Sequence, residues 1–174
     1  AFISILIHEF GHALTGLRLG ASNVQVSLYG MDGLARFDGA FFSRKSSILM
    51  TAAGPGASIA LAGVFFVVGK FLFSTGFSPS YAWELVRYFF NVVILINIFW
   101  SIINLLPVLP LDGGQILSSI LGPGRVKQTC VVSFMTIGAL AIFLWMWTGS
   151  YYNLIIMGFL ASHTLNVWQS NSAR

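Results

Sequence analysis

Five long apolar segments constrain the fold of this chain more than any other feature of its sequence. They cover residues 1–19, about 46–69, about 86–106, about 126–148 and about 150–168. A helix needs about 20 apolar residues to cross the hydrocarbon core of a bilayer, so each segment is long enough to span it. Only 8% of the residues are charged, which excludes an ordinary soluble domain. We therefore predict an all-α integral membrane protein, a polytopic bundle of about five spanning helices.

The length of 174 residues allows one compact bundle and leaves no room for a second soluble domain. We therefore expect residues 1–174 to form a single membrane-embedded domain. The sequence begins with Ala1 and reaches its first histidine after seven residues. We expect the natural N-terminus to be missing from it.

The basic residues predict how the chain crosses the membrane. The side reached after the first, third and fifth segments carries Arg18, Arg36, Arg44, Lys45, Arg125, Lys127 and Arg174, and the other side carries Lys70 and Arg87. Because cytoplasmic loops are enriched in Lys and Arg, we expect the first side to be cytoplasmic. The net charge is +4, but the sequence contains no run of Lys or Arg, so we expect no nucleic-acid partner. A bacterial plasma membrane is the expected location.

The first polar connection has the pattern of a small β-hairpin. Apolar and polar residues alternate over Val24–Leu28, turn-forming residues follow at Tyr29–Gly33, and Leu34–Phe37 could return as a second strand. We predict that this hairpin lies at the membrane face after the first helix. The alternative is a surface hairpin with no role in function.

The first apolar segment contains the motif His8-Glu9-Phe10-Gly11-His12. Residues four apart lie on the same face of a helix, so both imidazoles can reach one metal ion. Glu9 can then take a proton from a bound water without being a ligand, as in metalloproteases. The alternative is a buried histidine pair that only forms hydrogen bonds. Ionisable groups at membrane depth are costly and usually functional, which favours the interpretation that the motif belongs to a zinc hydrolase.

A second motif, Asn104–Gly114, interrupts an apolar stretch with two prolines and two glycines, so we expect the helix to break there. Non-helical backbone at membrane depth is tolerated where it is buried in protein or lines a wet cavity. Asp112 in this motif needs a cation as partner, and the zinc ion expected at His8 and His12 would be suitable. The alternative is an ordinary turn with Asp in a favoured position.

Four further features of the apolar segments are predicted to be structural. Asn97 is expected to join helices by hydrogen bonding. The small residues Gly56, Ala60 and Gly63 have the spacing of a flat face for close helix packing. Cys130 is expected to be a packing residue, and His163 has no partner at ligand spacing.

The two motifs, together with Ala53-Gly54-Pro55, resemble the site-2 protease family of intramembrane zinc metalloproteases, over residues 1 to about 121. The resemblance implies that His8, His12 and Asp112 are zinc ligands and that Glu9 is the general base. It implies further that Asn104 holds the substrate main chain and that the hairpin helps to present substrate. Only about fifteen residues separate the second and third segments, so the chain resembles the compact members without a PDZ domain.

We therefore expect residues 1–121 to be the catalytic core and residues 122–174 to be two accessory transmembrane helices. The expected activity is that of a zinc metalloendopeptidase that cleaves membrane proteins in or near their transmembrane segments, with an active site open toward the cytoplasm. One alternative is a non-catalytic zinc-binding subunit of a larger membrane complex, although such a subunit would not need Glu9. Another is a transporter that uses the broken helix as an ion site, although no inverted repeat is visible.

Overall fold

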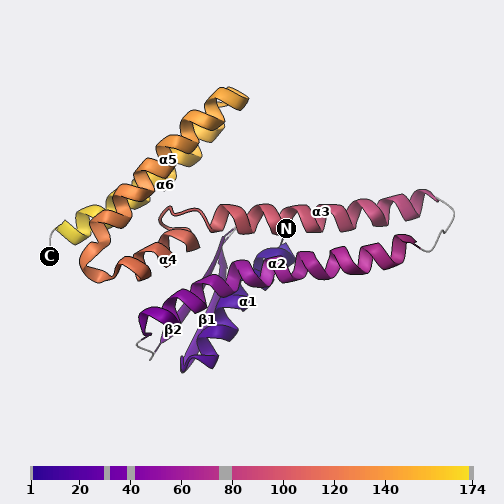
Figure 1. The fold of residues 1–174 in the computed structure, drawn as a ribbon, viewed down its shortest axis with the longest axis horizontal. Coiled ribbons are helices and arrows are strands. Elements are labelled where there is room, and N and C mark those ends of the chain that lie inside the picture. Colours follow the sequence, from indigo (N-terminus) through magenta and orange to yellow (C-terminus); the bar gives the residue numbers. More distant parts are fainter. Residues whose placement is uncertain (1, 30–31, 39–41, 75–79, 173–174) are drawn as a thin grey trace. The chain divides into compact units, whose positions relative to one another are not determined.

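The structure is a computed structural model and describes residues 2–29, 32–38, 42–74 and 80–172. Its elements are α1 (Phe2–Arg18), β1 (Asn23–Tyr29), β2 (Asp32–Asp38), α2 (Arg44–Ser74), α3 (Tyr81–Asn104), α4 (Asp112–Leu121), the short 3₁₀-helix η1 (Pro123–Arg125), α5 (Val126–Thr148) and α6 (Tyr151–Ser172) (Figure 1). They form two compact units, Ala1–Phe41 with Ala53–Ile103, and Phe42–Ala52 with Asn104–Arg174.

Each of the five predicted spans is helical over most of its length, but they are not equally suited to crossing a membrane. Among the described residues, three helices are long and apolar enough: Arg44–Ser74, Tyr81–Asn104 and Pro123–Thr148, the last counting η1 with α5. The other two are α1, which has only 17 residues, and α6, which carries polar residues such as Asn153, His163 and Asn166. The chain is thus an integral membrane protein with three clear candidate spans.

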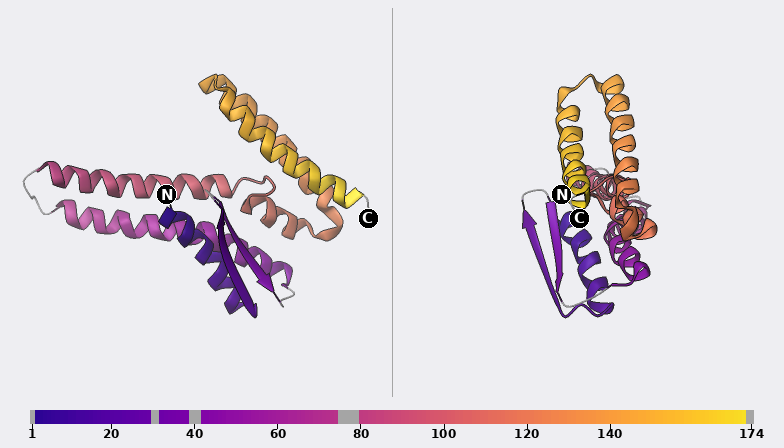
Figure 2. Two further views of the ribbon diagram at one scale, coloured as in Figure 1. Left: turned by 180° about the vertical axis from the view of Figure 1, so that it is seen from behind. Right: turned by 90° about the vertical axis from the view of Figure 1, so that its left-hand side faces the viewer.

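In the first unit, α3 runs antiparallel to the part of α2 that follows Ala52, and the two lie side by side (Figures 1 and 2). Aromatic rings fill the space between them: the ring centroids of Phe65 and Phe90 are 5.0 Å apart, and those of Phe73 and Trp83 are 5.3 Å apart. The Ser80 hydroxyl accepts a hydrogen bond from the Trp83 amide at 3.3 Å, which caps the start of α3.

Beside α1 lies an antiparallel pair of strands, β1 and β2 (Figure 2). Their register runs from Asn23 opposite Asp38 to Tyr29 opposite Asp32. Each strand is longer than the alternating pattern predicted, because main-chain pairing continues past the apolar residues. Gly30 and Met31, in the predicted turn, lie outside the described residues, and the association of this pair with the membrane stays a prediction.

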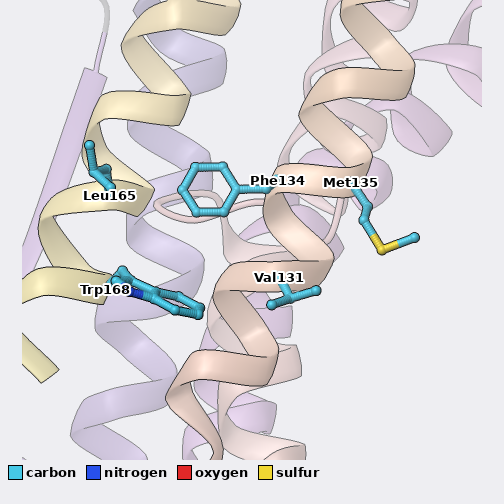
Figure 3. Close-up of a pocket in the computed structure, with 5 residues that line it drawn as sticks. All are labelled: Val131, Phe134, Met135, Leu165 and Trp168. Carbon is cyan, nitrogen blue, oxygen red and sulfur yellow. The ribbon is translucent and has the colours of Figure 1, made fainter. Parts of the chain in front are cut away.

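In the second unit, α5 and α6 form a hairpin of helices, with Gly149 between them in a left-handed conformation (φ 62°). A groove between the two helices is lined by Val131, Phe134, Met135, Leu165 and Trp168, and Figure 3 shows Phe134 pointing toward α6. At the same level, the Lys127 ammonium lies 5.8 Å from the centre of the Trp168 ring. The helix α4, which precedes this hairpin, was not predicted from the sequence.

Burial in this molecule is the reverse of that in a soluble protein. Large apolar side chains are exposed along α2, α3, α5 and α6, for example Phe66, Leu95, Ile142 and Phe159. Polar side chains are buried, namely Ser4, His8, Glu9, His12, Thr51, Ser58, Asn97, Ser101, Asp112, Thr129, Ser133 and Thr164. Since lipid rather than water contacts the outside of a membrane protein, an apolar surface and a hydrogen-bonded polar interior are expected.

Candidate metal centre

The two histidines of α1 face each other inside the first unit. His8 is 3% exposed and His12 is 9% exposed, and their Nε2 atoms are 3.2 Å apart. Two nitrogen ligands at the zinc–nitrogen distance of about 2.05 Å and at a tetrahedral angle would lie about 3.3 Å apart. The separation in the structure therefore matches two ligands of one zinc ion. The prediction that the two imidazoles share a helix face and converge is confirmed.

The Ser58 hydroxyl on α2 orients the ring of His8. It lies 3.3 Å from His8 Nδ1 and is itself almost fully buried. Histidines that bind metals typically donate the other ring N–H to an oxygen atom, which fixes the tautomer. If Nδ1 donates its hydrogen to Ser58, the lone pair of the imidazole is on Nε2, the atom directed toward His12.

Two glycines allow α1 and α2 to approach closely at this point. A Cβ atom on Gly54 of α2 would collide with the imidazole of His12, so the His12 ring lies directly against the helix backbone. A Cβ atom on Gly11 of α1 would collide with the Ala53 carbonyl and lie 2.9 Å from Ala57 Cβ. Both glycines therefore have the same structural effect: the absence of a side chain at Gly11 and at Gly54 lets α1 and α2 approach so closely that His12 lies against α2.

Glu9 lies beside this pair on α1 and is only 6% exposed. A buried carboxylate is costly unless it has hydrogen-bonding or cationic partners. A carboxylate has the chemistry to exchange a proton with a water molecule, and the predicted role of Glu9 as general base stays a prediction. The burial of the Glu9 side chain supports a role in the candidate site rather than at the protein surface.

The hydrogen bonds of α3 hold α1 and α2 in place around the histidines. Asn97 is fully buried and donates from Nδ2 to the Ser4 hydroxyl of α1 at 3.0 Å, which confirms its predicted role in joining helices. One turn further on, the Ser101 hydroxyl lies 3.3 Å from the Pro55 carbonyl of α2. Both contacts lie within the first unit, and they tie three helices together near the motif.

Asp112 belongs to the second unit, where it is the first residue of α4 and is buried. The two glycines after it are required by packing. A Cβ atom on Gly113 would collide with the Leu105 and Leu106 main chain, and one on Gly114 would lie 2.5 Å from the Val108 carbonyl carbon. The connection from α3 therefore folds back onto the first turn of α4. Asn104 is the last residue of α3 and is half-buried. The proposed roles of Asp112 and Asn104 stay predictions.

The predicted packing face of α2 was wrong. Gly56, Ala60 and Gly63 are exposed, and within the described chain nothing lies within 4 Å of a Cβ built on either glycine. The buried face is instead Gly54, Ser58 and Ala62, which are spaced four residues apart. The sequence contained this spacing, but both sets consist of small residues. Only the position of His12 distinguishes them.

Comparisons with known proteins find relatives of this chain among zinc metalloproteases. Residues 72–146, which include Asp112, match the model of peptidase family M50. A Synechocystis sp. protein provisionally named a zinc metalloprotease is 28% identical over 91% of this chain and 43% of its own length. A zinc metalloprotease of Methanocaldococcus jannaschii is 26% identical over 76% of this chain and 37% of its own length. This chain therefore spans less than half the length of these relatives.

The fold also has a counterpart among solved structures. A site-2 protease from Methanocaldococcus jannaschii superposes with a TM-score of 0.65 at 22% identity, covering 95% of this chain and 74% of that one. At that level of identity the likeness concerns the arrangement of the helices. It is independent of the family match, which rests on sequence.

Proposed function

Because this chain belongs to the site-2 protease family, we propose that it is a zinc-dependent endopeptidase that hydrolyses peptide bonds in or near the transmembrane segments of membrane proteins. One observation carries the proposal. The Nε2 atoms of His8 and His12 are 3.2 Å apart, beside a buried Glu9, on a helix of an integral membrane protein.

The proposed zinc ligands are His8, His12 and Asp112. They offer two imidazole nitrogens and one carboxylate oxygen, a set that suits zinc and leaves a fourth position for water or substrate. When bound, zinc would polarise the carbonyl of the scissile peptide and make water a better nucleophile at neutral pH. The hydroxyl of Ser58 and the backbone at Gly54 orient the two histidines for this purpose.

Side chains of the protein carry out the remaining steps, which are proton transfer and the binding of the substrate. Glu9 accepts a proton from the attacking water and returns it to the leaving amine. A transmembrane helix hides its peptide bonds, so a substrate must unwind before it can react. We propose that Asn104 holds the main chain of the unwound segment and that the β1–β2 pair offers it a strand edge.

In the membrane, we propose that α1 and α6 cross the bilayer with the three clear candidate spans, and that the β1–β2 pair lies at the face where the site opens. The distribution of basic residues supports the proposal that this face is on the cytoplasmic side. A bacterial plasma membrane is the proposed location, and membrane proteins are the proposed substrates. We propose residues 1–174 as one membrane-embedded domain.

Glu9→Gln tests the proposal, because it keeps the size of the side chain and removes its basicity. We expect zinc content to stay near that of the parent, while cleavage of a membrane peptide falls by about two to four orders of magnitude. The matched control is Glu84→Gln on α3, an exposed carboxylate 3.9 Å from Arg87, which should change neither quantity.

The outcomes separate an enzyme from a structural subunit. Parental cleavage by Glu9→Gln would contradict the role of Glu9 as general base. A zinc-loaded parent that cleaves none of a set of peptides with helix-loosening Gly, Pro or Asn residues would favour the non-catalytic subunit.

A further inference from the structure

The connection Leu105–Leu111 has neither helical nor strand hydrogen bonding, although it includes buried residues, among them Val108, which is fully buried. Its two prolines, Pro107 and Pro110, have no amide hydrogen. Backbone polar groups in a membrane protein need partners within the protein, because lipid offers none. The partners of this connection therefore show what determines its course.

On α5, the hydroxyl of Ser133 holds the connection from one side. It accepts a hydrogen bond from the Leu109 amide at 3.2 Å, and its own hydrogen lies within reach of the Pro107 carbonyl at 3.3 Å and the Thr129 carbonyl at 3.0 Å. Ser133 is fully buried. The Leu109 N–H, which has no helical acceptor, is thus paired by a side chain from a helix 24 residues away.

From α6, the hydroxyl of Thr164 contacts the other backbone polar group of Leu109, its carbonyl. It lies 3.1 Å from the Leu109 carbonyl and 3.0 Å from the Leu160 carbonyl, and it is fully buried. Serine and threonine in membrane helices commonly donate to the carbonyl four residues back. Ser133 and Thr164 have that local partner and, in addition, a partner in the connection.

Local contacts pair further backbone groups on both sides of Leu109. The Val108 amide donates to the Leu106 carbonyl at 2.7 Å, and Gln115 donates from its side chain to the Pro110 carbonyl at 3.0 Å and from its amide to the Leu111 carbonyl at 3.1 Å. Only two residues separate Leu109 from Asp112. A displacement of the Leu109 peptide must therefore be absorbed by these few residues or passed on to the Asp112 carboxylate.

We propose that Ser133 and Thr164 are positioning residues, a pair of hydroxyls that fixes the Leu109 peptide and thereby the carboxylate of Asp112 for metal binding. This inference rests on the proposed function in so far as Asp112 is a ligand. It assigns to α5 and α6 a direct part in shaping the site, since each helix provides one of the two hydroxyls.

Amide hydrogen exchange in the metal-free, detergent-solubilised chain tests the contact itself. Ser133→Ala and Thr164→Val should each speed exchange within residues 105–112 by about tenfold or more, since each leaves a buried backbone group without its partner. Thr164→Ser keeps the hydroxyl and should exchange like the parent. Thr136→Val is the matched control, because the Thr136 hydroxyl donates to the Val132 carbonyl on the same helix at 2.9 Å.

Zinc titration then tests the consequence for the site. Ser133→Ala and Thr164→Val should raise the zinc Kd by about tenfold, while Thr164→Ser and Thr136→Val leave it unchanged. The thermal unfolding midpoints of the metal-free Thr164→Val and Thr136→Val proteins should be similar, which separates positioning from a general loss of stability.

Unchanged exchange in both hydroxyl-deficient variants would overturn the proposal, and so would faster exchange with an unchanged zinc Kd in a protein whose Asp112→Ala variant binds zinc weakly. Should Asp112→Ala bind zinc as tightly as the parent, the ligand set of the proposed function would be wrong. The claim that these hydroxyls position a ligand would fail with it, whereas exchange would still show whether they hold the connection.

Discussion

The role of Gly54 depends on a single contact, that of its backbone with the imidazole of His12. Gly54→Ala places a methyl group where the ring lies, so the His12 ring must leave its present position beside His8 Nε2. We expect zinc content and cleavage to fall at least about tenfold, the effect of a shift of about 1.4 kcal/mol. The measurement is zinc content per chain with cleavage of the same peptide.

The control for this prediction is Gly56→Ala, two residues further along α2. Gly56 is exposed, and no described atom lies within 4 Å of the Cβ that the substitution adds. Alanine is favoured over glycine within a helix by up to about 1 kcal/mol, so this variant should keep its zinc and be at least as stable. Equal behaviour of the two variants would show that the close approach of α1 and α2 does not matter.

At the residue scale, the sequence predicts the role of residues whose spacing along a helix brings them together. It does not predict the role of residues that act by contacting a distant segment. His8 and His12 converge as expected because four residues make about one helical turn. Ser58 and Gly54 lie more than 40 positions further along the chain. Their role follows from which face of α2 meets α1, which periodicity among small residues does not determine.

Among the elements, the helices α1, α2, α3, α5 and α6 were predictable because each contains a long, mostly apolar run. The helix α4 was missed because it begins Asp112-Gly113-Gly114, and glycine disfavours a helix interior by about 1 kcal/mol. The structure shows why glycine is nevertheless needed there, since Leu105–Val108 pack against that turn. The break after Asn104 was predictable from its prolines, but the hydroxyls that pair its backbone were not.

The side of the membrane on which each connection lies can be measured with single cysteines. Asp32→Cys, in β2, should react with an impermeant thiol reagent only from the cytoplasmic side, and Tyr81→Cys, at the exposed start of α3, only from outside. The reason is the excess of basic residues on the first side. Cys130 is fully buried and should stay unlabelled. The opposite labelling pattern would reverse the proposed orientation.

For the whole molecule, the account requires that residues far apart in the sequence serve one metal ion. The histidines belong to the unit that contains α1, and Asp112 belongs to the unit that contains α4, α5 and α6. The contacts around the proposed ligands lie within the separate units: Ser58 and Gly54 contact the histidines in one, and Ser133 and Thr164 contact Leu109, three residues before Asp112, in the other.

The zinc content of the purified chain tests this central claim most directly, by comparing the parent with His12→Ala, Asp112→Ala and His163→Phe. The account predicts about one zinc ion per parent chain, loss of most of it in the first two variants, and retention in His163→Phe, because His163 is not a proposed ligand. Near-stoichiometric zinc in Asp112→Ala, or a large loss in His163→Phe, would contradict it.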